Sequence, residues 1–344
     1  MKRKVMAMVL TLVMVLSLTA CGTAKSESAS TAKTVKIGMV TDVGGVNDGS
    51  FNQSAWEGLQ KASTDLGVEV KYLESKTDAD YAPNVESFVD GDYDLIICVG
   101  YMLADATKAA AKANPDQKFA IIDDNSMKDI SNVTCLMFEQ SQASYLVGLV
   151  AGMSTKTNTV GFVLGMANAT MNQFGYGYLA GVIDANPKAK ILQTNANAFG
   201  DTAGGKSAAI AMVTKGADVI FHAAGGTGLG VIEGCVESKI SVIGVDSDQS
   251  KLAPKNMLTS AMKRVDNACY DVAKSCKEGT IKGGEIIYDL KTGGVDIAPT
   301  TTNLSQAIIT AVDKAKESIK SGTVTVPKTQ AQFEAKYGNV YELD

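Results

Sequence analysis

The chain repeats one pattern twice, in which short apolar runs alternate with stretches of helical periodicity. The first copy predicts strands at 35–40, 68–73, 94–98 and 119–122, with helices at 51–66, 81–89 and 104–113. The second copy predicts strands at 159–164, 190–193, 218–221 and 242–245, with one helix that ends at Ile183 and two that begin at Ser207 and Leu229. Such alternation builds parallel sheets with helices on both faces, which explains why the strands are apolar throughout. The sequence therefore predicts an α/β protein with two doubly wound, Rossmann-like lobes.

The N-terminus has the features of an export signal. Basic residues at positions 2–4 precede an apolar run over 5–18, which is too short for a comfortable membrane span. Residues 18–21 (LTAC) resemble the bacterial lipobox, in which the cysteine is diacylated, and two acyl chains suffice for stable anchoring. We therefore expect a signal peptide over 1–20 and a lipid anchor at Cys21. The alternative is an ordinary signal peptide that has a cysteine at the cut.

The segment 21–34 is small and polar, so we expect it to form a flexible tether. The folded part then begins near Val35, and it is longer than one hydrophobic core usually spans, which favours two lobes. No later apolar run reaches the length of about 18 residues that indicates a transmembrane helix.

Charge and composition argue against several classes of function. The net charge is −5, and no cluster of Lys and Arg occurs outside the signal, which argues against binding to nucleic acid. The cysteines after Cys21 lack CxxC spacing, which argues against a zinc site. The one histidine, His222, has no GxSxG elbow to accompany it, which argues against a Ser-His-Asp triad. We expect no metal, no cofactor and no catalytic residues.

The loop after the first predicted strand, residues 41–53, is rich in glycine and polar residues. Ligands of doubly wound sheets bind at the carboxyl ends of strands, so this loop is a candidate site. Its carboxylate and amide groups suit the edge of a planar polar ligand, and Phe51 suits its face. The alternative is a plain turn in which Asn47, Asp48 or Ser50 caps the next helix and Phe51 belongs to the core.

Three motifs occur together in this chain: residues 42–53 (DVGGVNDGSFNQ), 223–228 (AAGGTG) and 244–249 (GVDSDQ). Joined in this order, they resemble the basic membrane protein family of lipoproteins, the purine nucleoside receptors of ABC uptake systems. The resemblance covers essentially the whole mature chain. It implies a type I periplasmic-binding-protein fold with a nucleoside in the cleft between the lobes, permease subunits as partners, and attachment to the lipid membrane through acylated Cys21.

The resemblance also implies where the lobes divide, because the chain of such proteins crosses between the lobes three times. The N-terminal lobe is expected to comprise 35–140 plus about 258–280. The C-terminal lobe is expected to comprise 141–257 plus about 281–344.

The site residues implied by the resemblance lie at several strand ends. Phe51 would stack on one side of the base, and Phe221 or its neighbour His222 on the other, since strand alternation lets only one of these two point into the cleft. The candidates for the base edge are Asp42, Asn47, Asp48 and Asp123. The candidates for the ribose are Asp246 and Lys263, with the backbone of Gly225 and Gly226. The alternatives are that Asp246 and Asp123 are merely helix caps or loop residues and that Lys263 lies in a solvated first turn of a helix. His222 could likewise be a core or rim residue.

Competing interpretations come from two glycine-rich motifs and from the fold. Residues 200–207 satisfy the GxxxxGKS pattern of nucleotide triphosphatases, but the approach at 194–199 is polar where a buried strand should be. Residues 226–230 are GxGxG rather than the GxGxxG of dinucleotide-binding enzymes. A binding protein or receptor for a sugar or a small signalling molecule on the same fold is the main alternative.

Overall fold

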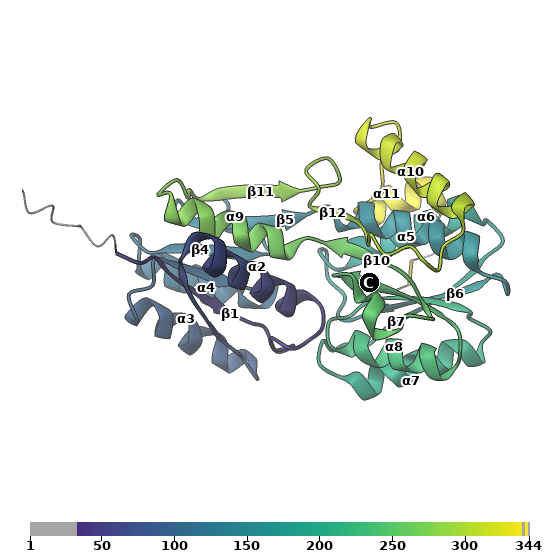
Figure 1. The fold of residues 1–344 in the computed structure, drawn as a ribbon, viewed down its shortest axis with the longest axis horizontal. Helices are drawn as coiled ribbons and strands as arrows, with labels where there is room; N and C mark the ends of the chain where they lie inside the picture. The colour runs from purple at the N-terminus through teal and green to yellow at the C-terminus, as the bar shows by residue number, and fades with distance from the viewer. Residues whose placement is uncertain (1–32, 339–340, 343–344) are drawn as a thin grey trace, which may run out of the picture. The chain divides into compact units, whose positions relative to one another are not determined.

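The computed structural model describes residues 33–338 and 341–342 (Figure 1). The predicted signal peptide, the anchor at Cys21 and the tether up to residue 32 lie outside the described residues. From Val35 on, the chain forms one compact unit. This unit contains two six-stranded sheets. None of the helices described is both long and apolar enough to span a bilayer.

The first sheet has the strand order β11-β5-β4-β3-β1-β2, and its strands all run parallel. The strands are β1 (Lys36–Val40), β2 (Glu69–Leu73), β3 (Leu95–Cys98), β4 (Lys118–Ile122), β5 (Val133–Phe138) and β11 (Gly284–Tyr288). The helices are α2 (Phe51–Leu66), α3 (Tyr81–Asp90), α4 (Ala104–Ala113) and α9 (Val265–Lys277), with short 3-10 turns η1 (Asp78–Asp80) and η2 (Tyr101–Leu103). Side chains alternate between two cores, since Ile37 and Met39 pack on the side of α2 and α9, and Ile96 and Cys98 on the side of α3 and α4.

The second sheet has the order β12-β10-β9-β8-β6-β7 and is parallel except for β12, which runs antiparallel to β10. Its strands are β6 (Thr159–Leu164), β7 (Lys190–Asn195), β8 (Val219–Ala223), β9 (Ser241–Asp246), β10 (Met257–Lys263) and β12 (Val295–Ile297). Its helices are α5 (Gln140–Ser154), α6 (Asn172–Ala185), α7 (Thr202–Thr214), α8 (Thr227–Glu237), η3 (Gln249–Leu252), α10 (Gln306–Lys320) and α11 (Gln330–Tyr337). Helices α7 and α8 cover one face, whereas α5 and α6 cover the other (Figure 1).

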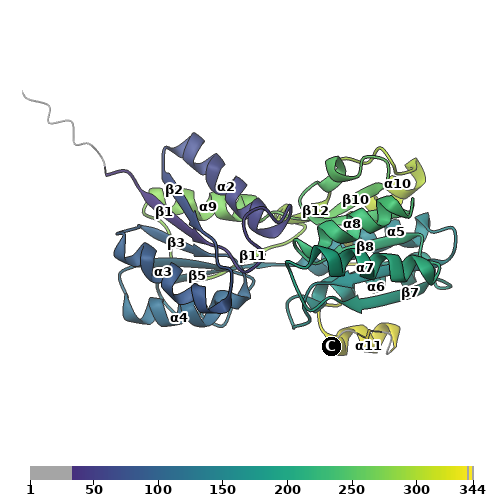
Figure 2. The same ribbon diagram turned by 90° about the horizontal axis from the view of Figure 1, so that it is seen from below.

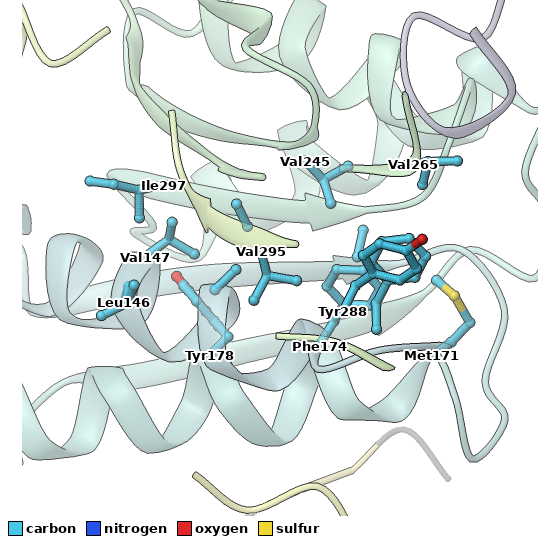
Figure 3. Packing of buried hydrophobic residues seen from close by; sticks show 14 of the residues in the cluster. Leu146, Val147, Met171, Phe174, Tyr178, Val245, Val265, Tyr288, Val295 and Ile297 are labelled. Carbon is cyan, nitrogen blue, oxygen red and sulfur yellow. The ribbon is translucent and has the colours of Figure 1, made fainter. Parts of the chain in front are cut away.

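The short edge strand β12 is held by apolar packing. Figure 3 shows Leu146 and Val147 of α5 and Tyr178 of α6 close to Val295 and Ile297 of β12. All five side chains are buried. This packing fixes the point at which the chain enters the second lobe for the last time.

The chain passes between the lobes three times, as the resemblance implied, but at different residues. The crossings follow β5, β10 and β11, and Figures 1 and 2 show α9 and β11 lying with the first sheet. Residues 258–263 were expected in the N-terminal lobe, yet they belong to β10, which pairs with β9 in the second sheet. Residues 284–288 were expected in the C-terminal lobe, yet they form β11 and pair with β5 in the first sheet. Both assignments depend on strand pairing between distant segments, which the predicted boundaries do not take into account.

Most elements of the two repeats have the predicted bounds to within a few residues. The helices predicted over 51–66 and 104–113 and the strand over 159–164 have the expected limits. Helix α7 differs, because it begins at Thr202 rather than near Ser207. The side chain of Asp201 accepts a hydrogen bond from the Gly204 amide and so starts the helix earlier.

Candidate functional site

A cavity lies between the carboxyl ends of the two sheets. It contains about 500 Å³ of space that no protein atom fills, and part of this space is open solvent. The residues that line it are Asp42, Gly44, Asp48, Phe51, Asn52, Gly100, Tyr101, Asp123, Met171, Phe174, Phe199, Ala223, Ala224, Gly225, Val245, Asp246 and Lys263. Both lobes therefore contribute to one site, at the edge where doubly wound sheets bind their ligands.

Two aspartates of the loop after β1 are buried and fixed by hydrogen bonds. Asp42 Oδ1 accepts from the backbone amide of Gly44 at 2.9 Å and from Asn52 Nδ2 at 2.7 Å. The Asp48 carboxylate accepts from the backbone amides of Asn52 at 2.9 Å and Gln53 at 3.1 Å, both in the first turn of α2. Asp48 thus caps α2, as one of the alternatives predicted, and it lines the cavity as well.

Lys263, the last residue of β10, forms a buried ion pair with Asp123, which follows β4 in the first lobe. Its ammonium also lies 4.9 Å from the ring centre of Phe51, 5.1 Å from that of Phe138 and 5.7 Å from that of Phe174, where cation–π attraction is effective. Lys263 therefore lies in the cavity wall rather than in a solvated helical turn. The second carboxylate oxygen of Asp123, Oδ1, is buried and has no hydrogen-bond partner among the described residues. It can accept a hydrogen bond from a ligand.

Asp246 lies at the end of β9 and accepts a hydrogen bond from Ser50 Oγ of the first lobe. Its φ of +63° resembles the +67° of Asp123, and both values fall in the left-handed region, where Asp is several-fold enriched among non-glycine residues. Strands β4 and β9 occupy the same place in the order of their sheets. The internal repeat of the fold thus brings two equivalent carboxyl groups to opposite walls of the cavity.

The burial of these carboxyl groups changes how they ionise. Loss of hydration raises the pKa of Asp42 to about 6 and that of Asp246 to about 7, and it also raises the pKa of Asp48. The charge of Lys263 opposes the effect at Asp246. Near neutral pH, the site can therefore both accept hydrogen bonds through ionised oxygens and donate them through protonated ones.

Phenyl rings reach the cavity from both lobes. Phe51 comes from the start of α2, and Phe199 comes from the loop after β7. The structure does not bring Phe221 to the cavity. Phe221 is fully buried in the core of the second lobe, where its ring stacks on that of Phe162 at 5.5 Å between ring centres. The reason is that β8 continues to Ala223, so Phe221 lies inside the sheet and not at its carboxyl edge.

Of the other predicted site residues, some line the cavity and others lie outside it. Gly225 lines the cavity, whereas its neighbour Gly226 and the exposed Asn47 do not. His222 is fully buried beneath Gly228, where a β-carbon would lie 2.1 Å from His222 Nδ1. Burial lowers the pKa of His222 to about 4, so the ring is neutral at physiological pH. It therefore packs inside the second lobe.

Sequence reasoning missed several residues of the cavity wall. Tyr101 follows β3, Phe174 lies in the first turn of α6 and Met171 immediately precedes that helix. Figure 3 shows Met171 and Phe174, which belong to the same buried cluster as Tyr288 at the end of β11. The position of Tyr101 after a predicted strand was a usable signal. Phe174 and Met171 lie beyond the strand end and carried none.

The GxxxxGKS segment serves as the start of a helix. Lys206 is partly exposed on α7 and forms an ion pair with Glu237 at 2.7 Å, and it does not line the cavity. Gly205 packs against α8, where a β-carbon would lie 2.0 Å from the carbonyl oxygen of Thr227. The glycines here allow two helices to approach closely.

Among the described residues, no group of three or more His, Cys, Asp and Glu side chains could hold a metal ion.

The family described as "ABC transporter substrate-binding protein PnrA-like" matches residues 35–330, which include both lobes and all the residues that line the cavity. This chain belongs to that family. The family consists of substrate-binding proteins of ABC transporters and not of enzymes, and these proteins act outside the cytoplasm. The PnrA-like assignment confirms the resemblance inferred from the three sequence motifs.

Relatives of this PnrA-like protein extend over nearly its whole length. It is 40% identical to the CD4+ T-cell-stimulating antigen of Listeria innocua, over 95% of this chain and 99% of that protein. It is 38% identical to the ABC transporter nucleoside-binding protein BmpA of Lactococcus lactis, over 88% of this chain and 92% of that protein. Among solved structures, a solute-binding protein of an ABC transporter system from Aeropyrum pernix matches with a TM-score of 0.81 and 27% identity, covering 89% of this chain and 98% of that one. These matches confirm the type I periplasmic-binding-protein fold.

Proposed function

We propose that this protein captures purine nucleosides in the cavity between its lobes and delivers them to the permease subunits of an ABC importer. The observation that carries the proposal is the pair of phenyl rings, Phe51 and Phe199, which reach one cavity from opposite lobes beside four buried carboxyl groups and one lysine. The nucleoside-binding protein of Lactococcus lactis, 38% identical to this chain, supports the same ligand class.

The rings account for the recognition of a planar base. Stacking a base on an aromatic side chain contributes about 1–3 kcal/mol per base, and any base has a face that can stack. Because Phe51 and Phe199 belong to different lobes, a base between them would gain contact with both lobes at once. A bicyclic purine offers a larger face to the two rings than a pyrimidine does. The ligand itself would thus favour the closed arrangement of the lobes.

The polar groups account for the recognition of the base edge and the ribose. Asp123 Oδ1 is buried without a partner and can accept a hydrogen bond from a base N–H. Asp42 and Asp48 are the other candidates for the base edge. On the opposite wall, Asp246 can accept from a ribose hydroxyl and Lys263 can donate to one, while the loop at Gly225 offers backbone groups.

The charge of the site selects against nucleotides. Lys263 is the one cation among the described residues that line the cavity, and its charge is already paired with Asp123. A phosphate group there would meet four carboxyl groups and no arginine, and the bidentate contacts that phosphate prefers would be missing. We therefore propose uncharged nucleosides as the substrates.

The proposal extends to the N-terminus, where the lipobox-like sequence ends in Cys21. Diacylation of Cys21 would hold the protein on the outer face of the cytoplasmic membrane, next to the permease. The polar segment 21–34 would give the binding unit reach from that anchor.

Isothermal titration calorimetry and thermal shift on the protein from Lys33 onward test the proposed ligand. Inosine, guanosine and adenosine should bind and raise the melting temperature, since a ligand at about 100 times its dissociation constant adds about 2.7 kcal/mol to the stability. Inosine monophosphate is the matched control for the phosphate, and arabinose represents the sugar alternative. Binding of arabinose together with no binding of any nucleoside would refute the proposal.

A further inference from the structure

One contact between the lobes lies outside the cavity wall. Gln249, the first residue of η3 in the second lobe, donates a hydrogen bond from its side-chain Nε2 to the carbonyl oxygen of Gly49 in the first lobe at 2.9 Å. Gln249 is only 2% exposed, and it is not among the residues that line the cavity. Its side chain therefore acts on the opposite lobe and not on the ligand.

The second lobe holds this side chain in place before it meets the first lobe. Gln249 Oε1 accepts from the backbone amide of Val245 at 3.0 Å, and the backbone amide of Gln249 donates to Ser260 Oγ at 3.1 Å. Gly244 leaves the necessary room, because a β-carbon at that position would lie 2.4 Å from Gln249 Oε1. With its oxygen engaged inside the lobe, the amide donates through Nε2 to the first lobe.

Gly49 presents its carbonyl from a tight turn that the second lobe also contacts. Its φ of +64° is one that glycine adopts without strain. Leu229 of α8 packs over it so closely that a β-carbon on Gly49 would lie 3.0 Å from Leu229 Cδ2. We call the contact of Gly49 with Gln249 and Leu229 the Gly49 clasp.

We infer that Gln249 is a positioning residue that latches the closed cleft through Gly49 and so sets how long the ligand stays bound. The inference rests on the proposed function. When the lobes separate, the Gln249 amide and the Gly49 carbonyl would exchange their mutual bond for water. The bond consequently favours the closed form only, and it must break before a bound ligand leaves. It does not exist when a ligand enters an open cleft, so the association rate does not depend on it.

The substitution Gln249→Glu tests this directly. The carboxylate keeps the shape of the side chain and can still accept from the Val245 amide, but it turns an acceptor oxygen toward the Gly49 carbonyl. Leaving these buried groups unpaired should raise the dissociation rate of inosine about tenfold or more, with a change in association rate of less than about threefold. Stopped-flow displacement of bound inosine measures the first rate, and mixing experiments measure the second.

Two further variants keep the test decisive. Leu229→Ala removes the other half of the clasp from a partly exposed position, so it should fold and should also raise the dissociation rate. Gln117→Glu is the matched control, since its Nε2 donates to the carbonyl of Lys118 within the first lobe at 3.1 Å, far from the cavity wall. It should leave both rates unchanged.

The outcomes separate this inference from the proposed function. If the wild-type protein binds no nucleoside, the proposed function fails. If the wild type binds inosine but both clasp variants release it at the wild-type rate, the clasp is refuted. A loss of stability to urea with an unchanged dissociation rate would also refute it, because that result assigns Gln249 a purely structural role.

Discussion

The assignment of Phe199 as the second stacking ring predicts that Phe199→Ala and Phe221→Ala affect different properties of the protein. Both residues are buried phenylalanines of the second lobe, with exposed fractions of 9% and 0%. Phe199 lines the cavity, whereas Phe221 packs against the rings of Phe162 and Tyr178, at 5.5 and 5.1 Å between ring centres. The first substitution should therefore weaken binding, and the second should weaken the fold.

The expected magnitudes follow from these surroundings. Loss of a base-stacking ring at Phe199 should cost about 1–3 kcal/mol of binding free energy, which is about a 5-fold to 150-fold rise in the dissociation constant. Loss of Phe221 should cost about 3–5 kcal/mol of folding free energy, because the ring is removed from a packed interior and leaves a cavity there. Phe51→Ala should behave as Phe199→Ala does.

The assay has two parts, carried out on each variant. Calorimetric titration with inosine gives the dissociation constant, and urea unfolding without ligand gives the free energy of unfolding. Titration to saturation with inosine gives the fraction of the Phe221→Ala sample that is folded and able to bind. The dissociation constant then refers to folded protein only. If Phe221→Ala binds inosine more weakly than Phe199→Ala does at equal folded concentration, the cavity described here is not the nucleoside site.

Three other predictions concern the acids, the GxxxxGKS segment and the anchor. Burial raises the folded-state pKa of Asp42 to about 6 and of Asp246 to about 7, so the folded protein retains protons that the unfolded chain releases above about pH 4. Stability should therefore fall as the pH rises from about 4 to about 7, and Asp246→Asn should make that fall smaller in melting curves. Lys206→Ala removes only the exposed pair with Glu237 and should leave the dissociation constant of inosine unchanged in calorimetry; a loss of binding would place the site elsewhere. Cys21→Ser should move the protein from the membrane fraction to the soluble fraction on immunoblots, and full membrane retention would contradict the proposed anchor.

The two repeats of the fold could be predicted because their signals are local. Strands buried on both faces are uninterrupted apolar runs, and helices such as α4 end at recognisable residues like Asn114-Pro115. The division of residues 258–288 between the lobes could not be predicted in this way. It depends on β10 pairing with β9 and on β11 pairing with β5, which are contacts between distant segments.

The candidate site could be predicted where a residue directly follows a strand, as Asp42, Asp123 and Asp246 do. The second ring was misplaced because the predicted strand at 218–221 stopped two residues before β8 does, which put Phe221 at an edge that it does not reach. The signal for Phe199 was present in the polar run 194–199, which is the loop at the carboxyl end of β7. From the sequence alone, that run is interpreted only as the approach to a phosphate-binding loop, and not as a strand-end loop that could carry a site residue.

The three crossings of the chain also determine when each lobe can be completed during synthesis. The first lobe begins at β1, yet its edge strand β11 ends at Tyr288, and α9, which packs on α2, ends at Lys277. A nascent chain that stops at the end of β5 has made five strands of a six-stranded sheet and leaves one side of α2 uncovered. The first lobe is thus complete only after most of the second lobe has been made. A truncation that spares every residue of the cavity wall but removes residues after 280 should still yield no stable first lobe.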